Sequence, residues 1–237
     1  MRIRLGEVVG WPYNSPDAPR APGRQTSPSA DAGALPRDAM TTHRVISPSD
    51  YRRMPWKNGG GRTTEIAAHP PGAGFDTFVW RVSVADVTQS VPFSAFPGVD
   101  RTLVLLAGKG LRLAGEGSPV DVHTEFEPVD FSGDQAIMCT LVDGSVRDFN
   151  LMVRRGHVRG AVVVLRAGEE ALPPATTYVC YAARGASEAL VAGYPPIPLH
   201  EDHALLVTED AGGRVPGLHV NPLAPGAIVL AAVIDVA

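Results

Sequence analysis

Apolar and polar residues alternate with a period of two through much of this chain, which is the pattern of strands whose two faces differ in environment. In the segment 77–87, Phe78, Trp80, Val82 and Val84 share one face, and the opposite face carries Arg81 and Ser83. The segment 148–154 alternates in the same way. It sets Asp148, Asn150, Met152 and Arg154 against Phe149, Leu151 and Val153. The alternation predicts both strands but does not decide which face points inward.

Other stretches predict strands by short apolar runs between turn residues. They cover residues 63–67, 102–107, 111–113, 121–129, 136–142, 161–165, 177–182, 204–207 and 227–236. Residues 102–110 also align with residues 177–185, since each segment is an apolar strand followed by a basic residue and a turn glycine. This internal repeat favours two tandem β-barrels over a single sandwich. We expect a first unit at residues 40–155 and a second at residues 156–237.

Residues 1–39 differ in kind from the rest. They are rich in Pro, Ala, Ser and Gly, and they offer little apolar surface to bury, so we expect a disordered N-terminal extension. No apolar core of a signal peptide follows Arg2 and Arg4. Met40 opens a more ordinary sequence, and we interpret it as the natural start of the protein.

Composition and charge exclude several classes of protein. The formal net charge is −4 and no basic run occurs, which argues against a nucleic-acid partner. No stretch approaches the ~20 apolar residues of a membrane helix, so we expect a cytoplasmic protein without membrane contact. Cys139 and Cys180 each lie in an apolar run and are expected to be buried, reduced core residues.

The run 55–65 is the first candidate for chemistry. Gly59, Gly60 and Gly61 permit positive φ angles and close backbone approach, as a ligand loop requires. Trp56, Lys57 and Asn58 precede the glycines, and Thr64 and Glu65 follow them. A stacking ring, an ammonium group and amide donors together suit a planar carboxylate ligand. The alternative is a flexible turn, although loops of this kind often carry function.

Two arginines are the second candidate. Arg81, with Ser83 on the same face, and Arg101 could each hold a carboxylate by two parallel hydrogen bonds. Ion pairs within the protein, such as Arg101 with Asp86, Asp100 or Asp148, are nearly as well supported. The nearby aromatic residues Phe93 and Phe96 are interpreted as core or loop anchors rather than ligand contacts.

Metal and nucleophile sites find little support. The sequence has no His-x-His pair, and His200 and His203 are interpreted as solvated loop residues, so no metal or other cofactor is expected. Gly-x-Ser-x-Gly is absent, and no Ser or Cys can be assigned a base. Asp148 and Asn150 would line a pocket if their strand face points inward.

Four ordered motifs together resemble the HutD/Ves family. The motifs are Trp-Lys-Asn-Gly-Gly-Gly at 56–61 with Thr-Glu-Ile at 64–66, Trp-Arg-Val-Ser-Val-Ala at 80–85, Phe-Ser-Ala-Phe-Pro-Gly-Val-Asp-Arg at 93–101 and Asp-Phe-Asn-Leu-Met at 148–152. The resemblance runs from about residue 40 to the C-terminus, although the second half matches only in its pattern of short apolar strands and turns. It implies an all-β, cupin-type double-stranded β-barrel in a tandem, bicupin-like arrangement, and a bacterial protein. Cupin enzymes typically hold a metal with a His-x-His pair, a Glu and a later His, a set that this sequence lacks.

Three functions are compatible with this resemblance. HutD members are associated with histidine utilisation as regulators, so the first is a regulatory protein that binds a small carboxylate such as urocanate or formylglutamate. The second is a metal-free hydrolase or isomerase with Glu65 or Asp148 as general base. The third is a structural role, and a homodimer is left open. The expected ligand-binding residues are Trp56, Lys57, Asn58, Thr64, Glu65, Arg81, Ser83, Arg101, Asp148 and Asn150.

Overall fold

The structure is a computed structural model, and it describes residues 4–5, 41–117, 119–168, 171–209, 213–215 and 217–237. In this part of the chain the regular secondary structure consists of strands β1 to β19, which form four sheets. No helix long and apolar enough to cross a membrane occurs among the described residues. The predicted all-β fold is therefore confirmed.

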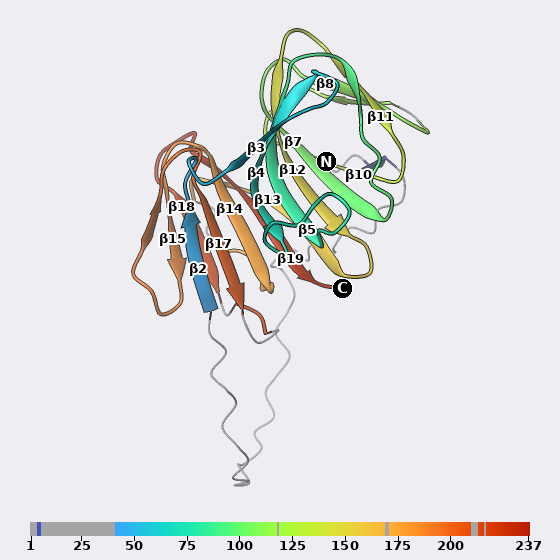
Figure 1. The fold of residues 1–237 in the computed structure, drawn as a ribbon. Coiled ribbons are helices and arrows are strands. Elements are labelled where there is room, and N and C mark those ends of the chain that lie inside the picture. Colours follow the sequence, from blue (N-terminus) through green and yellow to red (C-terminus); the bar gives the residue numbers. More distant parts are fainter. Residues whose placement is uncertain (1–3, 6–40, 118, 169–170, 210–212, 216) are drawn as a thin grey trace, which may run out of the picture.

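A seven-stranded and a four-stranded sheet form the first unit (Figure 1). The order of the larger sheet is β1 (Arg4–Leu5), β10 (Pro128–Ser132), β7 (Val99–Ala107), β12 (Val146–Arg154), β5 (Trp80–Val87), β4 (Gly61–His69) and β3 (Arg52–Pro55). The order of the smaller sheet is β6 (Val91–Phe93), β11 (Ile137–Leu141), β8 (Leu111–Ala114) and β9 (Val120–Val122). The pairing is antiparallel except between β1 and β10, which are parallel.

A five-stranded and a three-stranded sheet form the second unit. The larger sheet runs in the order β13 (Val158–Arg166), β19 (Ile228–Val236), β14 (Thr177–Arg184), β17 (Ala204–Glu209) and β2 (Thr41–Ile46). The smaller sheet runs in the order β16 (Ile197–Leu199), β15 (Ser187–Val191) and β18 (Leu218–Pro222). Among the described strands, the two sheets of a unit share no pairing, so each unit is an open, two-layered jelly roll and not a closed barrel.

The two units repeat one topology. The order β10-β7-β12-β5 in the first corresponds to β17-β14-β19-β13 in the second, and β11-β8-β9 corresponds to β18-β15-β16. A β-bulge lies at the same point of each repeat, where β12 pairs with β7 and where β19 pairs with β14. These bulges align Asp148 with Val229 and Leu105 with Ala182. The predicted tandem arrangement is confirmed, although the repeat read from the sequence was two residues out of register.

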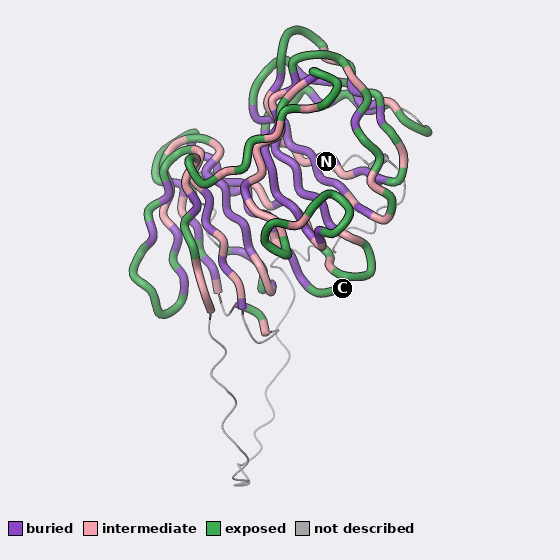
Figure 2. Tube along the Cα trace, in the orientation of Figure 1, coloured by how far each residue is buried: buried purple, intermediate pink, exposed green. Residues whose placement is uncertain are grey.

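The three largest of the four apolar clusters among the described residues hold the molecule together. One lies between the sheets of the first unit and includes Leu103, Leu111 and Phe131. A second fills the second unit, and the third joins the units, because it combines residues such as Phe149 and Leu151 of β12 with residues of β14 and β19. Figure 2 shows this buried region where the large sheets of the two units meet. Strands β5 and β12 are therefore buried on both faces.

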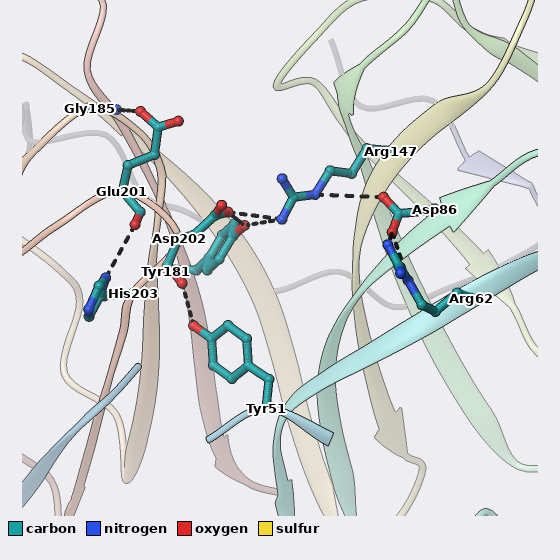
Figure 3. A network of polar contacts seen from close by, with 9 residues as sticks. All are labelled: Tyr51, Arg62, Asp86, Arg147, Tyr181, Gly185, Glu201, Asp202 and His203. Atoms are coloured by element: carbon teal, nitrogen blue, oxygen red, sulfur yellow. Dashed lines mark hydrogen bonds and ion pairs between the residues drawn. The ribbon is translucent and has the colours of Figure 1, made fainter. Parts of the chain in front are cut away.

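A polar network borders this junction (Figure 3). Arg147, at the start of β12, donates from Nη2 to Asp202 Oδ1 at 2.9 Å and to the Tyr181 hydroxyl at 3.2 Å. Its Nε lies 4.0 Å from Asp86 Oδ1 in the first unit. Tyr51, between β2 and β3, donates its hydroxyl to the Asp202 backbone oxygen at 2.6 Å. The network thus ties the first unit to the loop that precedes β17.

Some sequence predictions differ from the structure in detail. The predicted strand 121–129 divides into β9 and β10, because Phe126 has a φ of 60°, which a continuous strand does not allow. Strand β2, which lies in the segment assigned to the first unit, pairs with β17 of the second (Figure 1). Arg4–Leu5 forms β1 beside β10, and the remainder of the predicted disordered extension 1–39 lies outside the described residues. The unit boundaries themselves stay a prediction.

Candidate ligand-binding pocket

A cavity of about 610 Å³ opens between the sheets of the first unit. Its floor is the inward face of β5, β7 and β12. Across these strands Met152 pairs with Arg81 on one side and with Arg101 on the other. The next row toward the start of β12 pairs Asn150 with Ser83, and the row beyond it contains Asp148. The strand alternation read from the sequence therefore places these polar side chains together.

Arg81 is a buried cation that is ion-paired through one of its nitrogen atoms. It is 4% exposed, and its Nε donates to Glu65 Oε2 at 2.6 Å, while Glu65 comes from the neighbouring strand β4. The Phe75 ring lies 5.0 Å from the guanidinium carbon. The Nη2 atom of Arg81 is buried without a hydrogen-bond partner. An unsatisfied buried donor is costly, so a small movement of the side chain that brought this nitrogen to a ligand or water oxygen would be favourable.

Arg101 lies on the other side of Met152. It donates from Nη2 to Asn150 Oδ1 at 3.1 Å, and its Nε is buried without a partner. The Phe131 and Phe93 rings lie 4.9 and 5.4 Å from its guanidinium carbon. Burial lowers the pKa of Arg101 to about 10, against the opposing effect of Asp148, so the side chain stays a cation at neutral pH.

Asp148 is the fully buried carboxyl of the floor. Its Oδ1 accepts a hydrogen bond from Asn150 Nδ2, and its Oδ2 has no partner. Burial raises the pKa of Asp148 to about 7, because Arg101 and Asn150 offset the loss of hydration only in part. Asn150 thus links Arg101 to Asp148, and the predicted direct ion pairs of Arg101 do not form. Asp86 and Asp100 instead pair with Arg62 and Arg155.

The glycine run forms the turn of the β3–β4 hairpin at the rim of the cavity. Gly59 has a φ of 72°, and the backbone N–H of Gly60 donates to Asn58 Oδ1 at 3.1 Å. A Cβ on Gly61 would lie 2.5 Å from the Asp86 backbone oxygen. The Trp56 indole donates to Thr63 Oγ1 at 2.7 Å, so its ring is fixed. The glycines therefore allow a tight turn, and the residues before them reach the cavity.

This arrangement can hold a small anion in a largely apolar chamber. Aromatic side chains form the walls, and the floor presents two unpaired guanidinium N–H groups beside one unpaired carboxyl oxygen. Arginine side chains bind carboxylates in a geometry that suits planar oxyanions. Among the described residues no group of three His, Cys, Asp or Glu side chains is placed to hold a metal ion.

Comparison with known proteins decides the family. A family model described as HutD matches residues 48–223, which is most of the chain. The protein belongs to the HutD family. A Pseudomonas putida relative, described as an uncharacterized 21.2 kDa protein in the hutC 3' region, is 37% identical over 154 residues, covering 65% of this chain and 80% of the relative. Protein Ves of Citrobacter koseri is 37% identical over 119 residues, covering 48% of this chain and 61% of Ves.

Solved structures agree with this assignment. PA5104 of Pseudomonas aeruginosa PAO1, a conserved protein of unknown function, superposes with a TM-score of 0.73 at 35% identity and covers 82% of this chain and 99% of its own. HutD of Pseudomonas fluorescens SBW25, solved in a formate condition, has a TM-score of 0.70 at 27% identity, with 83% and 100% coverage. The resemblance stated from four sequence motifs is confirmed for this HutD-family chain.

The structure brings most of the predicted site residues together. Eight line the cavity: Trp56, Lys57, Asn58, Arg81, Ser83, Arg101, Asp148 and Asn150. Glu65 does not line it and instead holds Arg81 in place. Thr64 points to the opposite face of the sheet, where it borders a smaller hollow of about 190 Å³ together with Asp86, Arg147 and Asp202.

Sequence reasoning missed part of the apolar wall. Phe93 and Phe96, interpreted as anchors, line the cavity and also pack near Arg101. Phe75 and Met152 were not considered as site residues. Met152 could have been found from its alternation with Asp148 and Asn150, whereas Phe75 lies in the loop between β4 and β5, where no periodic pattern points to a cavity.

Proposed function

We propose that this HutD-family protein binds a small carboxylate in the cavity of its first unit and acts as a regulator linked to histidine utilisation. Urocanate and formylglutamate are the ligands that we propose to test first. Arg81 and Arg101 hold the carboxylate, and Trp56 with the phenylalanine walls covers the rest of the molecule. No metal ion takes part in this recognition.

The observation that carries the proposal is the pair of unsatisfied arginine nitrogens. Arg81 Nη2 and Arg101 Nε are both buried, both lack a partner, and both side chains line one cavity. Leaving two charged donors unpaired in an apolar chamber costs free energy, which a bound oxyanion would recover. The name of the Pseudomonas putida relative, which places it in the hutC 3' region, supports the link to histidine utilisation.

Calorimetric titration with histidine, urocanate and formylglutamate tests the proposal. We expect at least one acid to bind, and Arg101→Lys to weaken it more than about tenfold, because lysine cannot make the two parallel hydrogen bonds of a guanidinium group. Arg81→Lys should act in the same direction. Circular dichroism of each variant shows that the fold is intact.

Arg112→Lys is the matched control. Arg112 is an exposed arginine on β8 that pairs with Asp121 at 3.4 Å, away from the cavity. Its replacement should leave the affinity unchanged. Failure of all three acids to bind, or an equal effect of the three arginine variants, would argue against carboxylate recognition at this site.

A metal-free enzyme is the second candidate, and Asp148 is the observation that favours it. A carboxyl at the floor of a cavity, with a pKa of about 7 and one oxygen that has no hydrogen-bond partner, has the properties of a general acid or base. Glu65 is less suited to that role, because its carboxylate is engaged by Arg81. Chromatography of a bound acid after prolonged incubation tests this alternative. Conversion that is lost in Asp148→Asn would support it, and an unchanged acid would exclude it for that compound.

A further inference from the structure

The charges around Asp148 come from several strands. Arg81 on β5 and Arg101 on β7 are the cations of the floor, and Glu65 on β4 is ion-paired with Arg81 at 2.6 Å. The remaining titratable groups that act on Asp148 or its neighbours are Asp86 on β5, which faces the junction side, and the thiol of Cys139 on β11. Lys57 is exposed at the rim, where water screens its charge.

The net charge of these groups at the cavity floor depends only on whether Asp148 is protonated. The pair of Arg81 and Glu65 is neutral. Arg101 and an ionised Asp148 also sum to zero, whereas Arg101 beside a protonated Asp148 leaves one positive charge. A buried floor without net charge is a poor site for an anion, since the anion loses its hydration and gains little in return.

We propose that Asp148 determines when the pocket accepts its ligand: a carboxylate is bound together with one proton, which resides on Asp148. The protonated carboxyl leaves Arg101 free to neutralise the ligand, and the buried Oδ2, which has no hydrogen-bond partner, carries the proton. This inference rests on the proposed carboxylate binding and adds a proton linkage to it.

The geometry supports this role independently of any titration. Asn150 donates to Asp148 Oδ1 and accepts from Arg101, so Oδ1 is fixed as the acceptor and Oδ2 is the oxygen left for a proton. In the second unit, Val229 takes the place of Asp148, and the corresponding interior is filled by apolar side chains. Asp148 therefore lies in the unit whose interior contains the cavity, at a position that is apolar in the other unit.

The pH range follows from the groups present. The pKa of Asp148 in the free protein is about 7, and a bound anion would raise it further. Below pH 7 the proton is already in place, so affinity should vary little. Above pH 7 each bound carboxylate must bring a proton with it, and affinity should fall by up to about tenfold per pH unit. Arg101, with a pKa near 10, stays charged over this range.

Titration calorimetry of the whole protein with formylglutamate between pH 6 and 8.5 tests the inference. Its carboxyl groups stay ionised throughout, so any proton taken up belongs to the protein. Repetition in buffers of different ionisation enthalpy counts that proton. We expect uptake near zero at pH 6 and approaching one at pH 8, with the affinity falling in parallel. Acetate, the simplest carboxylate, serves as a second probe.

Asp148→Asn provides the decisive variant, because asparagine has the shape of a protonated aspartic acid and keeps an acceptor for Asn150. It should bind formylglutamate at pH 8 as tightly as the wild type binds it at pH 6, without proton uptake. Asp121→Asn, at an exposed carboxylate on β9, should behave as the wild type does.

Three results would overturn the inference. A wild-type affinity that is flat from pH 6 to 8.5 would show that no proton is coupled to binding. Loss of binding in a folded Asp148→Asn variant would show that Asp148 accepts a hydrogen bond from the ligand instead. If neither formylglutamate nor acetate binds at any pH, the proposed carboxylate function fails first, and the linkage fails with it. If the variant does not fold, the wild-type proton count alone decides.

Discussion

Asp148 and Val229 occupy the same position in the two repeats of this protein, just beyond equivalent β-bulges in the large sheets. One is a buried carboxyl at the floor of a cavity, and the other packs in an apolar core. Asn150 and Arg101 likewise align with Ala231 and Tyr178, so the polar residues of the cavity floor correspond to core residues in the second unit. Among the described residues, three of the six buried side-chain atoms without a hydrogen-bond partner belong to Arg81, Arg101 and Asp148, which line this cavity.

Replacement of Asp148 by asparagine should change how stability depends on pH. The pKa of this carboxyl is about 7 in the folded protein and 3.8 when unperturbed, so the folded state keeps a proton that the unfolded state releases between these values. Its contribution therefore makes the free energy of unfolding fall as the pH rises from about 4 to about 7. The asparagine side chain cannot ionise, and at pH 8 we expect the Asp148→Asn variant to be more stable than the wild type by about 1–3 kcal/mol. Urea unfolding at pH 5 and pH 8 measures this, and parallel pH dependence in the two proteins would contradict it.

At the scale of elements, the β3–β4 hairpin brings the predicted loop residues to the cavity. The turn depends on Gly59 and Gly61 for different reasons. Gly59 has the positive φ, whereas Gly61 lies against the backbone of β5 and the Trp56 ring. The loop therefore acts as a rigid support for Trp56, which a flexible glycine segment could not provide.

Alanine substitutions separate these two reasons. Gly59→Ala places a Cβ in open space and should cost only the strain of a left-handed backbone, about 1–2 kcal/mol. Gly61→Ala places a Cβ 2.5 Å from the Asp86 backbone oxygen, so strand β5 or the Trp56 ring must move. We expect a loss of about 2–3 kcal/mol and a changed Trp56 environment. Urea unfolding and tryptophan fluorescence measure both effects, and an unchanged fluorescence spectrum in Gly61→Ala would contradict the role of this glycine.

At the scale of the whole molecule, two jelly rolls share one core. The outward faces of β5 and β12 pack on β14 and β19, strand β2 crosses into the second unit, and Arg147 joins Asp86 to Asp202 along the junction. Separation of the units would expose a large apolar surface. We therefore expect a single unfolding transition, detected together by circular dichroism and fluorescence.

The polar network at the junction should contribute modestly to the free energy of unfolding. Arg147→Ala removes the donor to Asp202 and Tyr181, and because the side chain is partly exposed we expect a loss of about 1 kcal/mol in the free energy of unfolding. Lys109→Ala removes the exposed pair with Asp143 within the first unit and should cost less than about 0.5 kcal/mol. Equal losses in the two variants, measured by urea unfolding, would mean that the network adds nothing to the junction.

Much of the candidate site was readable from local sequence. Alternation alone placed Asp148 and Asn150 on one face and Phe149 and Leu151 on the other, and the structure keeps both sets. The side of the sheet that faces the cavity could not be predicted, because both faces of β12 are buried. Short strands such as β6 and β16 were missed, since three residues carry no measurable periodicity.

By itself, the sequence determined most of the longer β-strands, the tandem repeat, the polar face of β12 and the family, because these depend on period-two alternation and on the order of nearby residues. Only the tertiary structure decided that Glu65 supports Arg81, that Thr64 faces away from the cavity, and that β2 joins the second unit. Each of these depends on which strand lies beside which, and strand pairing joins residues far apart in the chain. The tertiary structure also decided that the polar face of β12 lines a cavity, because the other face is covered by the second unit.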